Sequence, residues 1–369
     1  MITETITRLT EGRDLSRDEA RRTVREMLGG DVSDAAISGL LIALKMKGET
    51  CDEITGFAEG MRELAISIRP DSGNLVDTCG TGGDRKGTFN ISTAAGFIAA
   101  AAGVTVAKHG NRSVSSRCGS ADVLEELGVE IAMDPERVRE CIDTVGIAFL
   151  FAPTFHPAMR RVVEARRSLG VPTVFNIVGP LVNPAGARAQ VLGVSRQELV
   201  SLVGEALVGL GVDRAFVVHG SDGMDEFTLA GETAVCEVAD GRLSRYTVAP
   251  EDLGLDRCRP GDIEGGDAAL NATIIRDVLS GAAGPSLDIS VANAAFAVVA
   301  GGKADSLEDG VRLAPGGRRV RGGRAAPRGD CGVFTRWRWK RCSWMTPWRR
   351  PGRRPGKGWR GSRWNSWSG

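Results

Sequence analysis

A glycine-rich segment, DTCGTGGD at 77–84, follows a short apolar run and precedes a helical pattern near Thr88. Glycines let a backbone turn tightly and bring bare N–H groups against phosphate oxygens, and the next helix start adds unpaired donors. Asn90, Ser92 and Thr93 stand at that helix start. The segment lacks the Gly-Lys-Ser/Thr of a Walker loop. It predicts either a phosphate-binding loop or a plain glycine turn in which Ser92 or Thr93 caps the helix.

A second polar segment, KHGNRSVSSRCGS at 108–120, follows another apolar run. Lys108 and Arg112 bring positive charge, and Asn111 with four serines brings hydrogen-bonding groups, which suits a polyanionic, hydroxyl-rich ligand. A mobile surface loop is the alternative. Two loops that leave the same ends of parallel strands face one crevice, so we favour a shared ligand site.

Two further patterns bear charge. Adjacent carboxylates such as Asp225 and Glu226 commonly hold Mg2+ beside phosphates, although alone they also fit a solvated acidic loop. A helix expected at 156–170 carries four arginines, a pattern typical of a solvated face. Among them, Arg166 is able to form a forked pair with a substrate carboxylate.

The elements that must position these residues fall into two groups. Residues 1–66 read as helices, with Ser/Thr-x-x-Glu capping boxes at Ser16–Glu19 and Thr50–Glu53. From about residue 67, short apolar runs alternate with amphipathic stretches, which predicts an α/β domain over 67–313 with a mainly parallel central sheet. We expect a helical insertion near 155–170 to join the small N-terminal helical domain.

The expected strands are 75–77, 104–107, 147–151, 171–175 and 215–219. The expected helices of the larger domain are 91–102, 121–127, 135–145 and 196–210, the last opened by a capping box at Ser195–Glu198.

Composition sets outer limits on the function. No run of about 18 apolar residues occurs, so no membrane span is expected and we predict a cytoplasmic protein. The eight cysteines form no C-x-x-C pair, which indicates reduced thiols rather than a zinc site.

Residues 314–369 differ from the rest of the chain. They hold fourteen Arg, two Lys, one Asp and all seven Trp, a net charge of +15, and since the whole chain carries +1 the remainder carries −14. Arginine interleaved with tryptophan is able to bind nucleic acid. We favour a reading-frame shift, because GC-rich codons read out of frame yield Arg, Gly, Pro and Trp, and we expect a disordered tail.

Together, the motifs GTGGD, TFNIST, KHGNRSVSSRCGSADVLEELG, FNIVGPLVNP and DGMDEFT resemble anthranilate phosphoribosyltransferases, in order and at similar spacing up to about Leu313. The resemblance implies a pentosyltransferase of the nucleoside phosphorylase/phosphoribosyltransferase fold type. Such an enzyme transfers the phosphoribosyl group from phosphoribosyl diphosphate to anthranilate in tryptophan biosynthesis. The resemblance further implies Mg2+ and a homodimer formed through the helical domain.

It also implies site residues. The phosphoribosyl diphosphate contacts implied are Gly80, Gly83, Asp84, Thr88, Asn90, Ile91, Ser92, Thr93, Lys108, His109, Gly110, Asn111, Arg112, Ser113, Val114, Ser115, Ser116 and Ser120. The implied metal ligands are Ser92, Asp225 and Glu226, and the implied anthranilate contacts are Gly80, Asn111 and Arg166.

Lys108 and Asp84 are the candidate catalytic residues, acting by electrostatics and positioning. The amine of anthranilate is neutral at pH 7, so no general base is assigned. Two other functions stay open at this point: an enzyme similar to pyrimidine nucleoside phosphorylases, and a nucleic-acid-binding protein that uses the basic tail.

Overall fold

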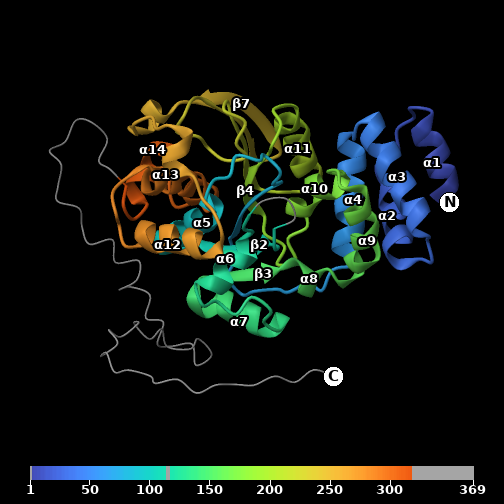
Figure 1. The fold of residues 1–369 in the computed structure, drawn as a ribbon, viewed down its shortest axis with the longest axis horizontal. Helices are drawn as coiled ribbons and strands as arrows, with labels where there is room; N and C mark the ends of the chain where they lie inside the picture. Colours follow the sequence, from blue (N-terminus) through green and yellow to red (C-terminus); the bar gives the residue numbers. More distant parts are fainter. Residues whose placement is uncertain (1, 114–116, 318–369) are drawn as a thin grey trace, which may run out of the picture.

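The computed structural model describes residues 2–113 and 117–317. Val114, Ser115, Ser116 and nearly all of the basic tail lie outside this part. Figure 1 shows a group of helices from the N-terminal region standing beside a larger layered domain built on a sheet. None of the helices in the described ranges is long and apolar enough to cross a membrane. No disulfide joins the six cysteines that lie there.

The N-terminal helices are α1 (Ile2–Thr10), α2 (Arg17–Gly29), α3 (Asp34–Lys47) and α4 (Cys51–Glu63). Both predicted capping boxes are confirmed, because Ser16 and Glu19 cap α2 reciprocally and Thr50 and Glu53 do the same for α4. A later helix, α9 (Arg160–Leu169), packs against α2 and α3. Segments more than a hundred residues apart in sequence therefore share one helical layer (Figure 1).

The sheet has seven strands in the order β3-β2-β1-β4-β5-β6-β7. They are β1 (Leu75–Gly80), β2 (Thr105–Gly110), β3 (Ile147–Phe151), β4 (Ala189–Gly193), β5 (Arg214–Gly220), β6 (Thr233–Ala239) and β7 (Arg242–Val248). The first five are parallel, whereas β6 and β7 are antiparallel additions. Strands β2 and β3 are added on one side of β1, and the strands from β4 onward are added on its other side. The order reverses between β1 and β4, so the crevice there is the usual ligand position of such a sheet.

Helices cover both faces of the sheet. The remaining helices are α5 (Ile91–Ala101), α6 (Ser120–Glu126), α7 (Pro135–Val145), α8 (Ala152–Phe155), α10 (Val174–Val178), α11 (Glu198–Gly209), α12 (Ala268–Leu279), α13 (Pro285–Ala300) and α14 (Leu307–Leu313). On one face, α5, α12 and α13 share a core with β1, β2 and β4. On the other, α10 and α11 join the sheet to the N-terminal helices in one continuous apolar cluster.

Two arginines tie the helical layer to the larger domain. Arg17 of α2 donates to the carbonyl oxygen of Gly209 at the end of α11, at 2.9 Å. Arg62 of α4 donates to the carbonyl oxygen of Leu181, also at 2.9 Å. The helical layer is thus anchored to segments that precede and follow β4.

Four of the five predicted strands are confirmed, and one is wrong. The run at 171–175 begins α10 instead, while the fourth parallel strand is Ala189–Gly193. A short apolar run reads the same in a buried strand and a buried helix. The helix forms here with Thr173 as its N-cap, whose N–H donates to Asn176 Oδ1 at 3.0 Å. The capping box at Ser195–Glu198 is also wrong, because α11 begins at Glu198 and its N-cap, Gln197, makes no side-chain cap bond.

Candidate active site

The glycine-rich loop leaves the carboxyl end of β1 and docks on the acidic loop that follows β5. The backbone N–H of Gly82 donates to Asp225 Oδ2 at 2.8 Å, and the N–H of Asp225 donates to Asp84 Oδ2 at 3.4 Å. Gly82 and Gly83 both have positive φ, 65° and 84°, a backbone conformation that favours glycine. A bare donor of this loop therefore already holds a carboxylate oxygen.

Glycine is also needed at the ends of β1 and β4, where the acidic loop crosses. A Cβ at Gly80 would lie 2.7 Å from Asp225 Oδ2, and one at Gly193 would lie 1.5 Å from the carbonyl oxygen of Asp225. Real Cβ atoms do not approach other heavy atoms that closely, and at Gly193 the neighbour is backbone, which cannot move aside as a side chain can. Glycine at the end of β4 therefore lets the acidic loop pass over this strand and reach the glycine-rich loop.

The first turn of α5 and a lysine of β2 complete the cluster. The N–H of Ser92 donates to Glu226 Oε1 at 3.1 Å. The ammonium group of Lys108 donates to the carbonyl oxygen of Thr78 and, at 3.3 Å, to Ser92 Oγ. Five predicted residues of one site, from four separate segments, thus lie in direct contact or share a partner.

Burial and mutual repulsion shape the charges in this cluster. Burial, with the nearby Asp84 carboxylate, raises the pKa of Asp225 to about 7, and burial beside Asp225 raises the pKa of Glu226 well above its ordinary value. Burial also lowers the pKa of Lys108, against the opposing effect of Asp77. A cation placed between these carboxylates would relieve their repulsion.

The donor set fits Mg2+ better than a metal enclosed by protein alone. In residues 2–113 and 117–317 no group of three or more His, Cys, Asp or Glu side chains is arranged to hold a metal. Mg2+ is usually held by one or two carboxylates together with water and substrate phosphate oxygens. Asp225, Glu226 and the Ser92 hydroxyl supply that kind of incomplete oxygen shell.

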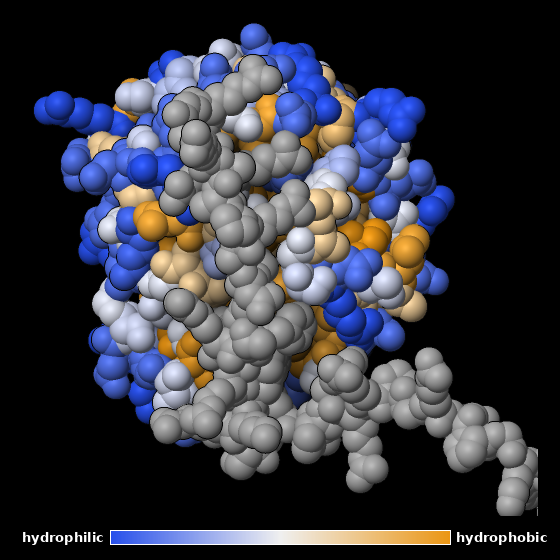
Figure 2. Space-filling view, turned by 90° about the vertical axis from the view of Figure 1, so that its left-hand side faces the viewer, coloured by the Kyte–Doolittle hydropathy of each residue, from blue (hydrophilic) through white to orange (hydrophobic). Residues whose placement is uncertain are grey.

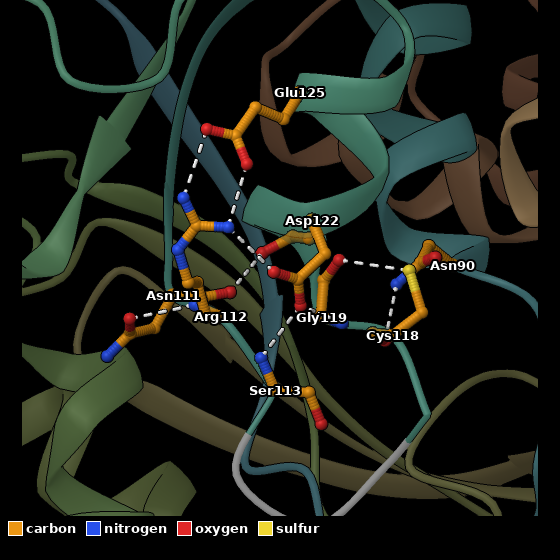
Figure 3. A network of polar contacts seen from close by, with 9 residues as sticks. Asn90, Asn111, Arg112, Ser113, Cys118, Gly119, Asp122 and Glu125 are labelled. Carbon is orange, nitrogen blue, oxygen red and sulfur yellow. Dashed lines mark hydrogen bonds and ion pairs between the residues drawn. The ribbon is translucent and has the colours of Figure 1, made fainter. Parts of the chain in front are cut away.

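The second polar loop is organised by one acidic residue of α6 (Figure 3). Asp122 Oδ2 accepts from the backbone N–H groups of Ser113 and Gly119 at 3.1 and 2.8 Å. The guanidinium group of Arg112 pairs with Asp122 and with Glu125. These interactions fold the ends of the loop onto α6.

Glycine again permits close approach, since a Cβ at Gly110 would lie 2.5 Å from Ser120 Oγ. Ser120 Oγ donates to the carbonyl oxygen of Asn111 at 3.3 Å. Gly110, Asn111, Arg112, Ser113 and Ser120 are therefore brought together, whereas Val114, Ser115 and Ser116 lie outside the described residues.

The segment 88–91, which leads into α5, is held by contacts with two other parts of the chain. Thr88 pairs with Glu264 in an isolated antiparallel bridge. The side chain of Asn90 donates to the carbonyl oxygen of Cys118 at 3.2 Å, which links the two predicted ligand loops. Ile91 is buried in the core, so only its backbone is available to a ligand.

Ordinary helix capping does not explain this helix start. The N-cap of α5 is Asn90, and it makes no side-chain cap bond. Capping by Ser92 or Thr93 is therefore wrong. The hydroxyl of Thr93 is buried and has no hydrogen-bond partner within the described ranges.

Arg166 stands apart from the cluster, on α9. Its guanidinium group lies over the ring of Phe175, 5.4 Å from the ring centroid, and burial lowers its pKa. Across residues 2–113 and 117–317 its side chain has no hydrogen bond or ion pair. A cation held this way is available to an anionic partner.

Sequence reasoning missed several residues that the fold brings to this region. The ring of His156, after α8, lies 5.2 Å from the ring of His109, between centroids. Asn183 bonds to Asp77 in β1 at 2.8 Å, and Gly193 lets the acidic loop cross. Asn183 belongs to the motif FNIVGPLVNP, but no local pattern marked His156 or Gly193, because their partners are distant in sequence.

Comparisons with known proteins agree with this architecture. The Glycosyl transferase family, a/b domain, matches residues 72–320, and the Glycosyl transferase family, helical bundle domain, matches residues 3–65. The anthranilate phosphoribosyltransferase of Syntrophotalea carbinolica is 50% identical over 330 residues, covering 85% of this chain and 94% of that protein.

Two solved structures are similar in fold. The crystal structure of anthranilate phosphoribosyltransferase from Thermus thermophilus is 46% identical, with a TM-score of 0.80, over 84% of this chain and 92% of that one. The Saccharomyces cerevisiae anthranilate phosphoribosyltransferase in complex with PRPP and Mg is 26% identical, with a TM-score of 0.76, over 85% and 92%.

Proposed function

The chain belongs to the anthranilate phosphoribosyltransferase family, and from this premise we propose how its residues perform the family's reaction. The enzyme is a pentosyltransferase that transfers the phosphoribosyl group of 5-phosphoribosyl 1-diphosphate to the amine of anthranilate. The products are N-(5-phosphoribosyl)anthranilate and diphosphate. We propose that this reaction serves tryptophan biosynthesis.

The observation that carries this proposal is the convergence of four segments: the glycine-rich loop after β1, the first turn of α5, Lys108 of β2 and the acidic loop after β5. Gly82 contacts Asp225, Ser92 contacts Glu226, and Lys108 contacts Ser92. Glycine-loop N–H groups, one buried ammonium group and two carboxylates are the partners that a metal-bound diphosphate requires.

The chemistry needs stabilisation of charge more than proton transfer. Breaking the bond between the anomeric carbon and the diphosphate develops negative charge on the leaving group and positive charge on the sugar. Lys108 and the glycine-loop N–H groups stabilise the departing diphosphate, and Asp84 helps to hold the glycine loop on the acidic loop. The neutral amine attacks without a base, so catalysis is mainly positioning.

Mg2+ is the metal that this donor set favours. Asp225, Glu226 and Ser92 would hold it, and when bound it would neutralise part of the diphosphate charge. In support, the yeast relative was solved in complex with PRPP and Mg.

The remaining predicted contacts divide between the two substrates. Gly80, Gly83, Thr88 and Asn90 to Thr93 serve phosphoribosyl diphosphate from β1 and α5, and the segment 108–116 with Ser120 serves it from the second loop. Arg166 binds the anthranilate carboxylate as a forked pair, and Gly80 and Asn111 are the other anthranilate contacts. A yeast relative has been solved in complex with 4-fluoroanthranilate.

We further propose a cytoplasmic homodimer formed through the helical layer. Met46 on α3 is 81% exposed and Val163 on α9 is 49% exposed, and these two helices pack side by side. Exposed apolar side chains on adjacent helices are typical of an interface between subunits. Sedimentation of the wild type and of a Met46→Glu, Val163→Asp variant tests it, since the variant should be monomeric.

The decisive experiment follows the loss of anthranilate fluorescence in the presence of phosphoribosyl diphosphate and Mg2+. We expect the fluorescence to fall only when the protein, phosphoribosyl diphosphate and Mg2+ are all present. One diphosphate should be released for each anthranilate consumed. Phosphorolysis of thymidine without any turnover of anthranilate would instead indicate the pyrimidine nucleoside phosphorylase alternative. Salt-dependent RNA or DNA binding that disappears on removal of residues 314–369 would support the nucleic-acid alternative.

A further inference from the structure

One buried charge near the site has no part in the function proposed above. Asp77 lies in β1, three residues before Gly80, and its side chain is completely buried. Burial raises its pKa to about 6, against the opposing effects of the Asn183 bond and of Lys108. Burying a carboxylate costs free energy of folding unless its oxygens accept hydrogen bonds.

Both carboxylate oxygens of Asp77 are engaged by segments of the site. Oδ1 accepts from the backbone N–H of His109 at 3.1 Å, and Oδ2 accepts from Asn183 Nδ2 at 2.8 Å. His109 directly follows Lys108, and Lys108 in turn donates to the carbonyl oxygen of Thr78, the residue after Asp77. Asp77 therefore helps to fix the position of Lys108 in β2 relative to the start of the glycine-rich loop.

Asn183 is held in one orientation. Its Nδ2 also donates to the carbonyl oxygen of Ala107 at 2.8 Å, and its Oδ1 accepts from the N–H of Ala185 at 2.9 Å. A flip of the amide would lose all of these bonds. The same segment is held from the helical layer by Arg62, through the carbonyl oxygen of Leu181.

A buried carboxylate can also serve stability alone, as Glu53 does. Glu53 is likewise completely buried and accepts from the N–H groups of Leu15 and Thr50 at 2.9 and 2.8 Å. It lies in the helical layer, and its partners belong to no ligand loop. Asp77 differs because the backbone that it fixes carries a candidate catalytic residue.

We propose, resting on the function proposed above, that Asp77 is a positioning residue for phosphoribosyl transfer. With Asn183 it fixes the backbone at Lys108 and His109 relative to the glycine-rich loop. The Lys108 ammonium group is thereby held beside Ser92, where the leaving diphosphate must bind.

The test compares Asp77→Asn with Glu53→Gln. In Asp77→Asn the new amide has one acceptor oxygen for two donors, so either the His109 N–H or the Asn183 amide faces another donor. We expect kcat/KM for phosphoribosyl diphosphate to fall about tenfold or more, because small displacements of catalytic groups have effects of that order. Glu53→Gln should lower the melting temperature while its kcat/KM stays within about twofold of wild type.

A reciprocal exchange separates positioning from folding. The double variant Asp77→Asn, Asn183→Asp restores a donor and an acceptor between the two residues, but the carboxylate at position 183 no longer donates to the carbonyl oxygen of Ala107. It should therefore recover only part of the lost kcat/KM. Should Asp77→Asn fail to fold, Asn183→Ala takes its place and should lower kcat/KM in the same direction. A variant of Asp77 or Asn183 that is less stable but keeps wild-type kcat/KM would overturn the proposal.

Calorimetric titration with inorganic diphosphate and Mg2+ adds a readout that does not depend on the acceptor. We expect weaker diphosphate binding in Asp77→Asn than in wild type and Glu53→Gln, and equal binding would also overturn the proposal. If wild type binds diphosphate but never consumes anthranilate, the proposed function fails while the role of Asp77 is still tested.

Discussion

Partial burial over an aromatic ring sets Arg166 apart from the other arginines of α9, because Arg160, Arg161 and Arg167 are exposed. Arg167 is paired with Glu164, whereas the side chain of Arg166 covers the ring of Phe175. The structure therefore gives a reason to choose Arg166 as the carboxylate-binding residue. The sequence alone offered none, since four arginines on one helix look alike.

Arg166→Ala should raise the KM for anthranilate by roughly thirtyfold, because a charged hydrogen-bonded pair contributes about 2 kcal/mol. The KM for phosphoribosyl diphosphate should change little. Steady-state kinetics with each substrate varied in turn checks this, with Arg167→Ala as the matched control. Equal increases in both KM values would contradict the assignment.

The acidic pair makes a prediction about metal dependence. Asp225→Asn combined with Glu226→Gln should raise the Mg2+ concentration for half-maximal activity by roughly tenfold or more, since changes even to the partners of metal ligands have effects of this size. Activity measured across a Mg2+ series checks this. Glu232→Gln, at an exposed position nearby, is the control, and an unchanged Mg2+ curve for the double variant would show that the ligands lie elsewhere.

The two buried histidines predict how stability depends on pH. Burial lowers the pKa of His109 to about 3, with His156 and Lys108 adding to the effect, and burial lowers the pKa of His156 to about 4. Below about pH 6.5 the unfolded chain binds protons that the folded chain does not. The two histidines therefore contribute a loss of stability as the pH drops from about 6.5 to 4, of up to about 1.4 kcal/mol per pH unit for each. The raised pKa values of the buried carboxyl groups Asp77, Asp225 and Glu226 act in the opposite direction over this range.

Urea unfolding of the wild type and of His156→Gln at pH 7 and pH 5 measures the histidine contribution. Because one group with a lowered pKa is removed in His156→Gln, its stability at pH 5 relative to pH 7 should be higher than that of the wild type. A difference that is the same in the variant and the wild type would mean that His156 does not titrate as its burial indicates.

At the scale of elements, helix starts show where local patterns are reliable. Ser16 makes a genuine capping box on α2, whereas the similar pattern at Ser195 does not cap α11. At Ser195 the backbone N–H donates instead to Thr81 Oγ1 at 3.2 Å, because the loop after β4 turns towards the glycine-rich loop. Tertiary contact overrides the local signal there.

Ser16→Ala should lower the free energy of unfolding by about 1 kcal/mol, the usual cost of a lost N-cap. Ser195→Ala should change it by only a few tenths of a kcal/mol, because no capping bond is removed. Urea unfolding of both variants compares them directly. A loss at Ser195 as large as that at Ser16 would show that the helix is capped as the sequence pattern suggested.

At the scale of the whole molecule, the match to the family does not extend over most of the basic segment 314–369. The matched region stops at residue 320, and the α/β domain is described only to residue 317. Figure 2 shows patches of hydrophobic residues among hydrophilic ones on the side of the molecule that carries α12, α13 and α14. Leu313 at the end of α14 is 52% exposed. We propose that the basic tail results from a reading-frame shift that replaced a covering helix.

Sequencing the 3′ end of the gene should reveal an insertion or deletion near codon 314. A chain with the frame restored should be more stable by about 2 kcal/mol or more, the contribution of burying one large apolar side chain. Urea unfolding of the two chains measures the difference. An intact frame in the gene, or equal stabilities, would contradict the proposal.

The sequence by itself determined the two-part organisation, four of the five parallel strands and the loops that carry the predicted site. These features depend on neighbours in the chain: alternation of apolar runs, glycines after strands and capping residues before helices. Tertiary structure alone decided that β4 lies between β1 and β5, that Gly193 lets Asp225 reach Gly82, and that Asp77 bonds to Asn183. Each of these contacts joins residues far apart in sequence, so no local pattern encodes it.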